Sequence, residues 1–121
     1  MSTRPRVLVL GLAPYRVPGP WDPEPVAAAL RAARDRFAAE DVEAVECYVG
    51  LDGSDDVKQV VTDAVSGGPW ACVLVGAGLR HGADVAVFEQ VLNVVHHGAP
   101  EAAIALNDTV DDVVDAVLRH L

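Results

Sequence analysis

Four short apolar segments alternate with four segments of helical periodicity, and this alternation limits the folds open to the chain. The apolar segments lie at residues 7–10, 45–49, 71–75 and 102–106 and have the composition of buried strands. The amphipathic segments lie at residues 23–40, 55–66, 83–97 and 109–121. Alternating strands and helices join through right-handed crossovers into a parallel sheet with helices on both faces. The sequence therefore predicts one α/β domain over residues 1–121, built as a three-layer αβα sandwich.

The polarity of each apolar segment predicts its place in the sheet. Residues 7–10 and 71–75 are apolar throughout, which is typical of central strands buried on both faces. Residues 45–49 alternate apolar side chains with Glu46 and Tyr48, which favours an edge strand. We therefore expect a four-stranded sheet in the order 2-1-3-4, an arrangement of the flavodoxin-like or Rossmann-like type.

Charge and cysteine content disfavour several classes of partner. Nine Lys and Arg against eighteen Asp and Glu give a net charge of −9, which argues against binding to nucleic acid or anionic membranes. Cys47 and Cys72 lack CxxC spacing and a disulfide framework, so free thiols are expected. The apolar run at residues 7–10 is too short for a signal peptide or a membrane span. These features predict a cytoplasmic protein with neither a nucleic-acid nor a membrane partner.

Two connections point to a ligand site. Ligands of open parallel sheets bind beyond the carboxyl ends of the strands, where the winding reverses. In the predicted order this point lies between the first and third strands. The connection at residues 11–25 is rich in proline and carries Tyr15, Arg16 and Trp21. The connection at residues 76–82 is rich in glycine, so its amides can face a ligand.

The glycine-rich connection predicts a small anionic ligand. Amides around Gly76 and Gly78 can bind an anion, and the Arg80 guanidinium suits a carboxylate or phosphate. We expect Tyr15, Arg16 and Trp21 to cover this ligand. In the alternative interpretation the glycines only shape a turn, and Arg80 pairs with a nearby acid. The spacing matches a dinucleotide fingerprint poorly, so no cofactor is expected.

An enzymatic role stays open at this point. His81 is the best acid–base candidate, because the unperturbed pKa of histidine is about 6.5. Asp52 and Asn107, at neighbouring strand ends, would orient a substrate. Motifs of serine hydrolases, zinc proteases and P-loop proteins are missing from the sequence. The acids at helix starts are explained by capping and by the helix dipole, so no metal is expected.

The segment at residues 83–97 supports a competing hypothesis. Its apolar surface is wider than a stripe facing the sheet requires. Glu89, Asn93 and His96 are spaced to share one polar face near Phe88. These four residues would then form the interface of a homodimer, and the chain would be a non-enzymatic structural or interaction module. Alternatively, the polar cluster is an ordinary solvated face.

The second half of the chain carries a recognisable series of residues. The series is Gly76-Ala77-Gly78-Leu79-Arg80, Phe88-Glu89, Asn93, His96 or His97, Ala99-Pro100 and Asn107. It resembles a family of short, uncharacterised α/β proteins from bacteria and fungi. In that family two prolines typically follow the arginine, whereas His81 and Gly82 follow it here. The resemblance implies the same fold class and draws attention to the same residues, but it implies no activity.

Overall fold

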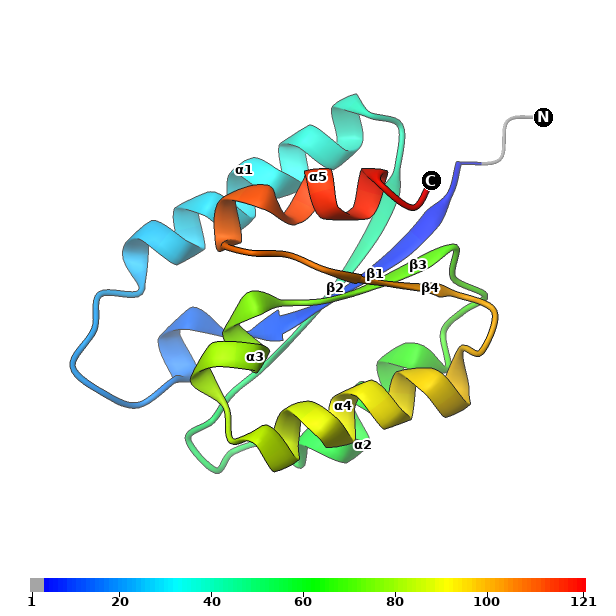
Figure 1. Ribbon diagram of the computed structural model, residues 1–121. Helices are drawn as coiled ribbons and strands as arrows, with labels where there is room; N and C mark the ends of the chain where they lie inside the picture. Colours follow the sequence, from blue (N-terminus) through cyan, green and yellow to red (C-terminus); the bar gives the residue numbers. More distant parts are fainter. Residues whose placement is uncertain (1–3) are drawn as a thin grey trace.

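All four strands of the sheet run parallel. The computed structural model describes residues 4–121. Its strands are β1 (Arg6–Leu12), β2 (Glu43–Val49), β3 (Cys72–Val75) and β4 (Ala103–Leu106), in the order β2-β1-β3-β4 (Figure 1). The predicted fold class and strand order are therefore confirmed, and β2 lies at an edge of the sheet.

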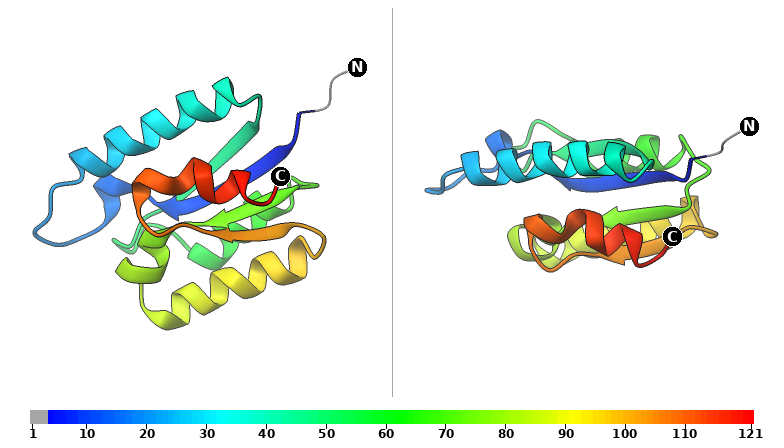
Figure 2. Two further views of the ribbon diagram at one scale, coloured as in Figure 1. Left: turned by 45° about the horizontal axis from the view of Figure 1, so that its top comes forward. Right: turned by 90° about the horizontal axis from the view of Figure 1, so that it is seen from above.

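Helices cover both faces of this sheet. The helices α1 (Glu24–Ala39) and α5 (Val113–Leu118) pack on one face, and α2 (Val57–Val65) and α4 (Val85–Gly98) pack on the other (Figures 1 and 2). Three short elements follow strands: the 3-10 turn η1 (Pro14–Arg16), the helix α3 (Ala77–Gly82) and the 3-10 turn η2 (Val110–Asp112). Because the strands are parallel, these elements all lie at the carboxyl edge of the sheet.

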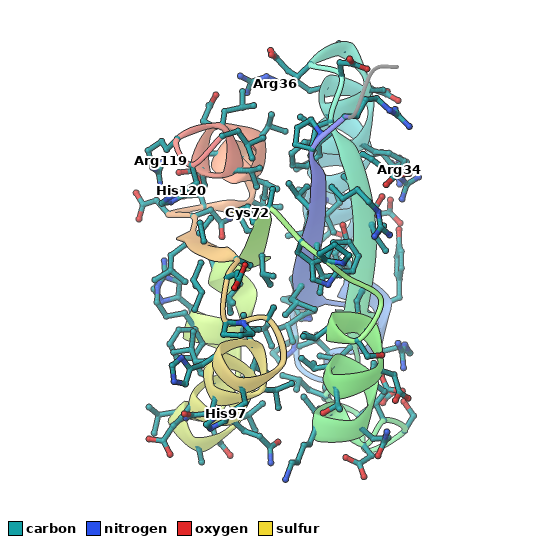
Figure 3. All side chains as sticks on the ribbon, turned by 90° about the vertical axis from the view of Figure 1, so that its right-hand side faces the viewer. Arg34, Arg36, Cys72, His97, Arg119 and His120 are labelled. Atoms are coloured by element: carbon teal, nitrogen blue, oxygen red, sulfur yellow. The ribbon has the colours of Figure 1, made fainter. Side chains whose placement is uncertain are left out.

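Alternating side chains of the central strands fill two separate cores. Val7 and Val9 of β1 belong to the core under α1 and α5, together with Cys72, which is labelled in Figure 3. Leu8 and Leu10 belong to the core under α2 and α4. A strand buried on both faces needs apolar residues at every position, which explains the continuous apolar run of β1.

The helix boundaries depend on short polar side chains. Asp56 caps α2 by accepting from the Gln59 amide at 3.1 Å. A capping box of Thr109 and Asp112 begins the turn η2 before α5. The predicted helix at residues 83–97 is confirmed as α4. Within residues 4–121, no helix has the length and apolar character that crossing a membrane requires.

Candidate functional site

A cavity of about 630 Å³ opens at the carboxyl edge of the sheet, between the ends of β1 and β3. Residues from both connections singled out by the sequence line it, and so do residues of α1 and of the turn after β4. The cavity therefore lies where the winding of the sheet reverses, which is the usual ligand position in an open parallel sheet.

Apolar side chains form most of the cavity wall. They come from β1, β3, the connection after β1, α1, the turn η2 and the first residue of α5. These side chains are Val9, Leu12, Val17, Trp21, Val26, Leu30, Leu74, Val110 and Val113. The Trp21 indole N–H donates to the Val17 carbonyl at 3.1 Å, which fixes the ring relative to this connection. A wall of this kind suits a small organic molecule.

Asn107 lines the cavity but uses its side chain to brace the protein. It is 3% exposed, and its Oδ1 accepts from the Ala77 amide at 2.8 Å. Its Nδ2 donates to the Thr109 carbonyl at 2.6 Å. The side chain thus joins the start of α3 to the turn after β4. The structure thus shows a positioning role for Asn107, while its contact with a ligand stays a prediction.

The segment at residues 76–82 is a helix and not an open, amide-lined loop. Its residues Ala77–Gly82 form α3, and the Gly76 amide donates to the Leu10 carbonyl at 2.8 Å. The Ala77 amide is bonded to Asn107. The amides of Gly76 and Ala77 therefore already have partners within the fold, and the anion site on the amides around Gly76 and Gly78 stays a prediction that these two contacts do not favour.

Gly76 is needed for close packing between strands. A Cβ atom built at Gly76 would lie 2.9 Å from the Leu10 carbonyl oxygen, which is backbone and cannot move aside easily. At Gly78, by contrast, the nearest atom would be a Leu12 side-chain carbon at 3.4 Å, an ordinary contact. The first glycine thus allows β3 to lie beside β1 up to its last residue.

The Arg80 guanidinium forms a hydrogen bond with a backbone carbonyl and not with an acidic side chain. Its Nη2 donates to the Asn107 carbonyl at 2.8 Å and lies 3.3 Å from the His81 Nε2. A guanidinium group can only donate, so this contact is a hydrogen bond when the His81 Nε2 carries no proton. His81 lines the cavity, while Arg80 does not. The alternative in which Arg80 pairs with an acid is also not observed in the described chain.

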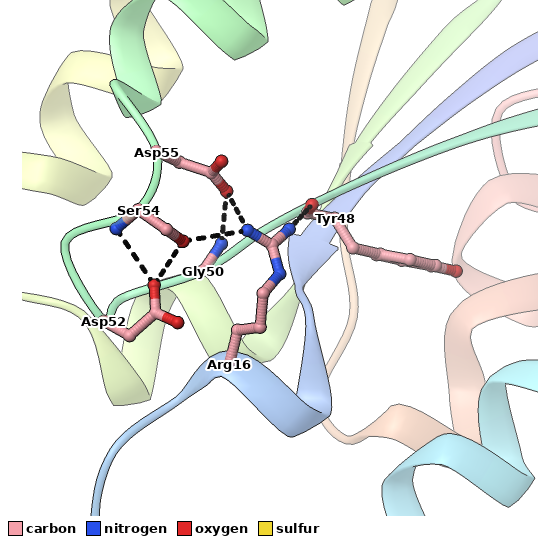
Figure 4. A network of polar contacts seen from close by, with 6 residues as sticks. All are labelled: Arg16, Tyr48, Gly50, Asp52, Ser54 and Asp55. Atoms are coloured by element: carbon pink, nitrogen blue, oxygen red, sulfur yellow. Dashed lines mark hydrogen bonds and ion pairs between the residues drawn. The ribbon is translucent and has the colours of Figure 1, made fainter.

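Arg16 turns away from the cavity (Figure 4). Its Nη1 lies 2.7 Å from the Asp55 Oδ2 and 3.2 Å from the Ser54 Oγ, and its Nη2 is 3.3 Å from the Tyr48 carbonyl. A hydrogen bond from the Gly50 amide, together with the Arg16 guanidinium, lowers the pKa of Asp55 below its usual value. Arg16 therefore ties η1 to the connection between β2 and α2 and does not line the cavity, so its role in covering a ligand stays a prediction.

The Asp52 side chain also forms its hydrogen bonds within its own connection, between β2 and α2. Its Oδ1 accepts from the backbone amide of Ser54 at 3.0 Å and from the hydroxyl of the same residue. These hydrogen bonds lower the pKa of Asp52. Asp52 does not line the cavity, so the structure gives no support to a role in orienting a substrate there.

Of the two aromatic residues predicted to cover a ligand, the structure brings only Trp21 to the cavity. Tyr15 is 62% exposed and donates from its hydroxyl to the Glu24 carboxylate at 2.7 Å. This hydrogen bond joins η1 to the first turn of α1. Tyr15 thus lies outside the cavity wall, and its contact with a ligand stays a prediction.

Tyr48 is a cavity residue that the sequence analysis did not identify. Strand register places it beside Gly11, where a Cβ atom would lie 3.2 Å from the ring. Gly11 thus makes room for the aromatic ring at the end of β1. Burial, with the nearby Glu46 carboxylate, raises the pKa of Tyr48 strongly, so its hydroxyl stays neutral. Residues 44, 46 and 48 alternate along β2 and so point to one face of the sheet. This pattern could have identified Tyr48 as a cavity residue from the sequence.

The residues predicted for a homodimer interface lie on α4, apart from the cavity. Phe88 packs partly into the core under α2 and α4, while Glu89, Asn93 and His96 are exposed. The Asn93 Nδ2 donates to the Glu89 carbonyl within the same helix at 3.0 Å. The three polar residues therefore share the exposed side of α4.

The site has to be assigned without a metal centre among the described residues and without a matching protein. Across residues 4–121, no three His, Cys, Asp or Glu side chains gather in a way that could hold a metal ion. The chain matches no protein-family model, no curated protein and no solved structure. The family resemblance stays a prediction, and the cavity must be interpreted from its own geometry. That geometry defines a doubly wound α/β domain with an apolar cavity at its switch point.

Proposed function

We propose that this chain is a binding domain for a small, largely apolar molecule, held in the cavity at the carboxyl ends of β1 and β3. One observation carries the proposal: a cavity of about 630 Å³ with a mostly apolar wall lies at the switch point of the sheet. Cavities of this size and position bind cofactors and metabolites in other open α/β sheets.

The ligand proposed here differs from the small anion that the sequence suggests. An anion would have been held by Arg16, Arg80 and the amides around Gly76. Arg16 is paired with Asp55, and Arg80 donates to a backbone carbonyl. The Gly76 amide donates to the Leu10 carbonyl. Apolar contact is therefore the main interaction that this cavity offers a ligand.

His81 is the acid–base group that we propose for any reaction in this cavity. It lines the wall, and an imidazole ring can donate or accept a hydrogen bond through its two nitrogens. Loss of turnover in His81→Ala, with ligand binding retained, is the result expected of an enzyme. Unchanged turnover in this variant would remove His81 from any mechanism.

A variant that fills the cavity tests the proposed function. Val26 lines the cavity from α1, whereas Val85 is 79% exposed on α4. Nile red, an uncharged apolar dye, should bind the wild-type chain and Val85→Trp with saturation, but not Val26→Trp. Circular dichroism checks that both variants fold, and Leu30→Phe is a milder second way to fill the cavity. Saturable binding that survives in the folded Val26→Trp and Leu30→Phe variants would refute this site.

We propose homodimer formation as a second candidate function. Two side chains of the edge strand β4 support it, since Ile104 is 38% and Leu106 41% exposed. They face the same side of the sheet as α4, because Ala105 between them packs toward α5. A sedimentation experiment should then show a dimer at micromolar concentration, and Ile104→Lys should dissociate it. A wild-type monomer at that concentration would contradict this candidate.

We also propose a cytoplasmic location. Cys47 and Cys72 are both free thiols, as expected for a reducing compartment. The net charge of −9 further supports a protein that does not bind nucleic acid.

A further inference from the structure

Over residues 4–121, the ionisable side chains that line the cavity include a carboxylate but no permanently positive group. The described residues that line it include one carboxylate, Asp108, and one imidazole, His81, but no lysine and no arginine. The chain as a whole carries a net charge of −9, which adds a weaker negative potential. The cavity therefore offers an apolar ligand a carboxylate and no permanently cationic side chain.

Asp108 is held in place by its backbone and keeps its carboxylate free. Its amide donates to the Asp112 carboxylate, at 3.0 Å to Oδ1 and 3.2 Å to Oδ2, which fixes the turn after β4. Its own side chain makes no hydrogen bond or ion pair with any residue in the described part of the chain, and the residue is exposed. This carboxylate can therefore accept a hydrogen bond from a ligand without breaking an internal contact.

Two aromatic rings in the wall also favour a cation. Trp21 and Tyr48 both line the cavity, and an aromatic face attracts a cation within about 6 Å of its centre. Tyr48 remains a neutral phenol, since burial raises its pKa. Neither ring offers comparable attraction to an anion, because the face of an aromatic ring is electron-rich.

Two basic side chains must be weighed against this preference, Arg80 and Arg119. The Arg119 Nη2 donates to the Leu106 carbonyl at 3.0 Å, and Arg119 does not line the cavity. The Arg80 guanidinium contacts the cavity residue His81 but does not itself line the cavity. Its Nη2 is bonded to the Asn107 carbonyl at 2.8 Å, which partly compensates its charge. Asp108 belongs to the wall and its carboxylate has no partner among the described residues, so it is available to a ligand more directly than Arg80, which does not line the cavity.

From these observations we propose that the cavity selects hydrophobic ammonium ions: molecules with an apolar body in the cavity and a protonated amine beside Asp108. This inference rests on the proposed binding function and further specifies that the ligand carries a positive charge. The amine would donate to the Asp108 carboxylate and lie against the aromatic part of the wall.

A series of three ligands with the same chain length tests the proposal. The probes are n-octylammonium, 1-octanol and octanoate, each titrated into the full chain by calorimetry at neutral pH and low salt. The ammonium should bind most tightly, the alcohol next and the carboxylate most weakly. A solvent-exposed charge pair of this kind predicts a preference of up to about fivefold for the ammonium over the alcohol.

Two charge-matched variants locate the origin of this preference. Asp108→Asn should bring the ammonium affinity down to that of the alcohol and leave the alcohol affinity unchanged. Asp111→Asn is the control, because it removes the same charge from a nearby exposed residue outside the cavity wall. Since the Asp108 carboxylate has no partner within the fold, its variant should retain wild-type stability, which a thermal melt checks.

The outcomes separate this inference from the proposed function. If 1-octanol binds but octanoate binds as tightly as n-octylammonium or more so, the charge preference is wrong and the apolar cavity stands. An equal loss of ammonium affinity in Asp108→Asn and Asp111→Asn would also overturn the inference. It would show that the net charge of the protein, and not the Asp108 carboxylate, causes the preference. If none of the three probes binds, the proposed function itself fails.

Discussion

At the scale of single residues, Asn107 connects the parts of the fold that surround the cavity. Its amide group bonds to the Ala77 amide and to the Thr109 carbonyl, so it fixes two of the segments that form the wall. A buried asparagine with both ends of its side chain satisfied is typical of a positioning residue. The shape of the cavity therefore depends on a residue that has no free group for a ligand.

Replacing Asn107 by alanine should destabilise the protein by about 1–3 kcal/mol, because the buried Ala77 amide loses its acceptor. Urea unfolding measures this change. Asn93→Ala is the matched control, since Asn93 is exposed and bonds only to its own helix, and its effect should stay within about 0.5 kcal/mol. Equal stability of the two variants would show that Asn107 does not brace the fold.

Two glycines of the same segment should respond differently to an added methyl group. Gly76→Ala places a Cβ atom against the Leu10 carbonyl and should cost about 1–3 kcal/mol. Gly78→Ala adds a methyl group within α3 at ordinary contact distance and should be neutral or stabilise by up to about 1 kcal/mol. Thermal or urea unfolding of both variants checks the contrast, which is absent if close strand packing does not require Gly76.

At the scale of elements, ion pairs outside the cavity hold the helices and connections in place. Arg34, labelled in Figure 3, binds the Glu46 carboxylate through two nitrogens, at 2.6 and 3.0 Å, and so joins α1 to β2. The Arg36 Nη2 lies 2.5 Å from the Asp115 Oδ1 and joins α1 to α5. The pair of Arg16 and Asp55 joins η1 to the connection before α2 in the same way.

The pair of Arg16 and Asp55 should make stability depend on acid pH. The pKa of Asp55 is lower in the folded chain than in the unfolded chain, where it is about 3.9. Its stabilising contribution is therefore complete above that unfolded value and disappears as the pH falls through the lower, folded value. Asp55→Asn should lower stability at neutral pH and reduce the loss of stability on acidification.

Unfolding by urea at a series of pH values between neutral and about pH 2 tests this dependence. Asp63→Asn is the control, because the Asp63 carboxylate accepts from the neutral Gln59 side chain on an exposed helix surface. Its profile should be parallel to that of the wild type. A profile for Asp55→Asn that is also parallel to the wild type would show that this pair does not couple folding to protonation.

The sequence predicted the elements well where hydrophobic periodicity determines them. The apolar runs of β1 and β3 and the stripe of α4 were identified because burial on the sheet requires these patterns. The helix α3 was missed, since its glycines favour a turn and Leu79 is the one large apolar side chain that anchors it in the core. Tertiary packing, rather than local propensity, forms this helix.

The site was predicted less well than the fold because it depends on contacts between distant residues. Arg16 and Asp55 are 39 residues apart, and nothing local in the sequence pairs them. The place of Tyr48 in the cavity follows from its register against Gly11. Periodicity thus located the edge of the sheet where the cavity lies, but it could not show which polar side chains were already engaged.

At the scale of the whole molecule, the fold separates two surfaces that can act independently. The cavity lies at the carboxyl edge, between β1 and β3, whereas the exposed apolar side chains of β4 lie on the side of the sheet that α4 covers. Binding of a ligand and contact with a second copy therefore do not compete for the same residues. The proposed function depends only on the first surface.

Mapping amide shifts by NMR during titration with 1-octanol tests the binding site most directly. The proposal predicts saturable shifts at Gly11, Tyr48 and Ala77 and at the Trp21 indole, all of which line the cavity. Residues of the groove between α2 and α4, such as Thr62 and Gln90, should not shift. Shifts confined to that groove, or no saturable shift at the carboxyl edge, would contradict the central claim that this edge is a ligand site.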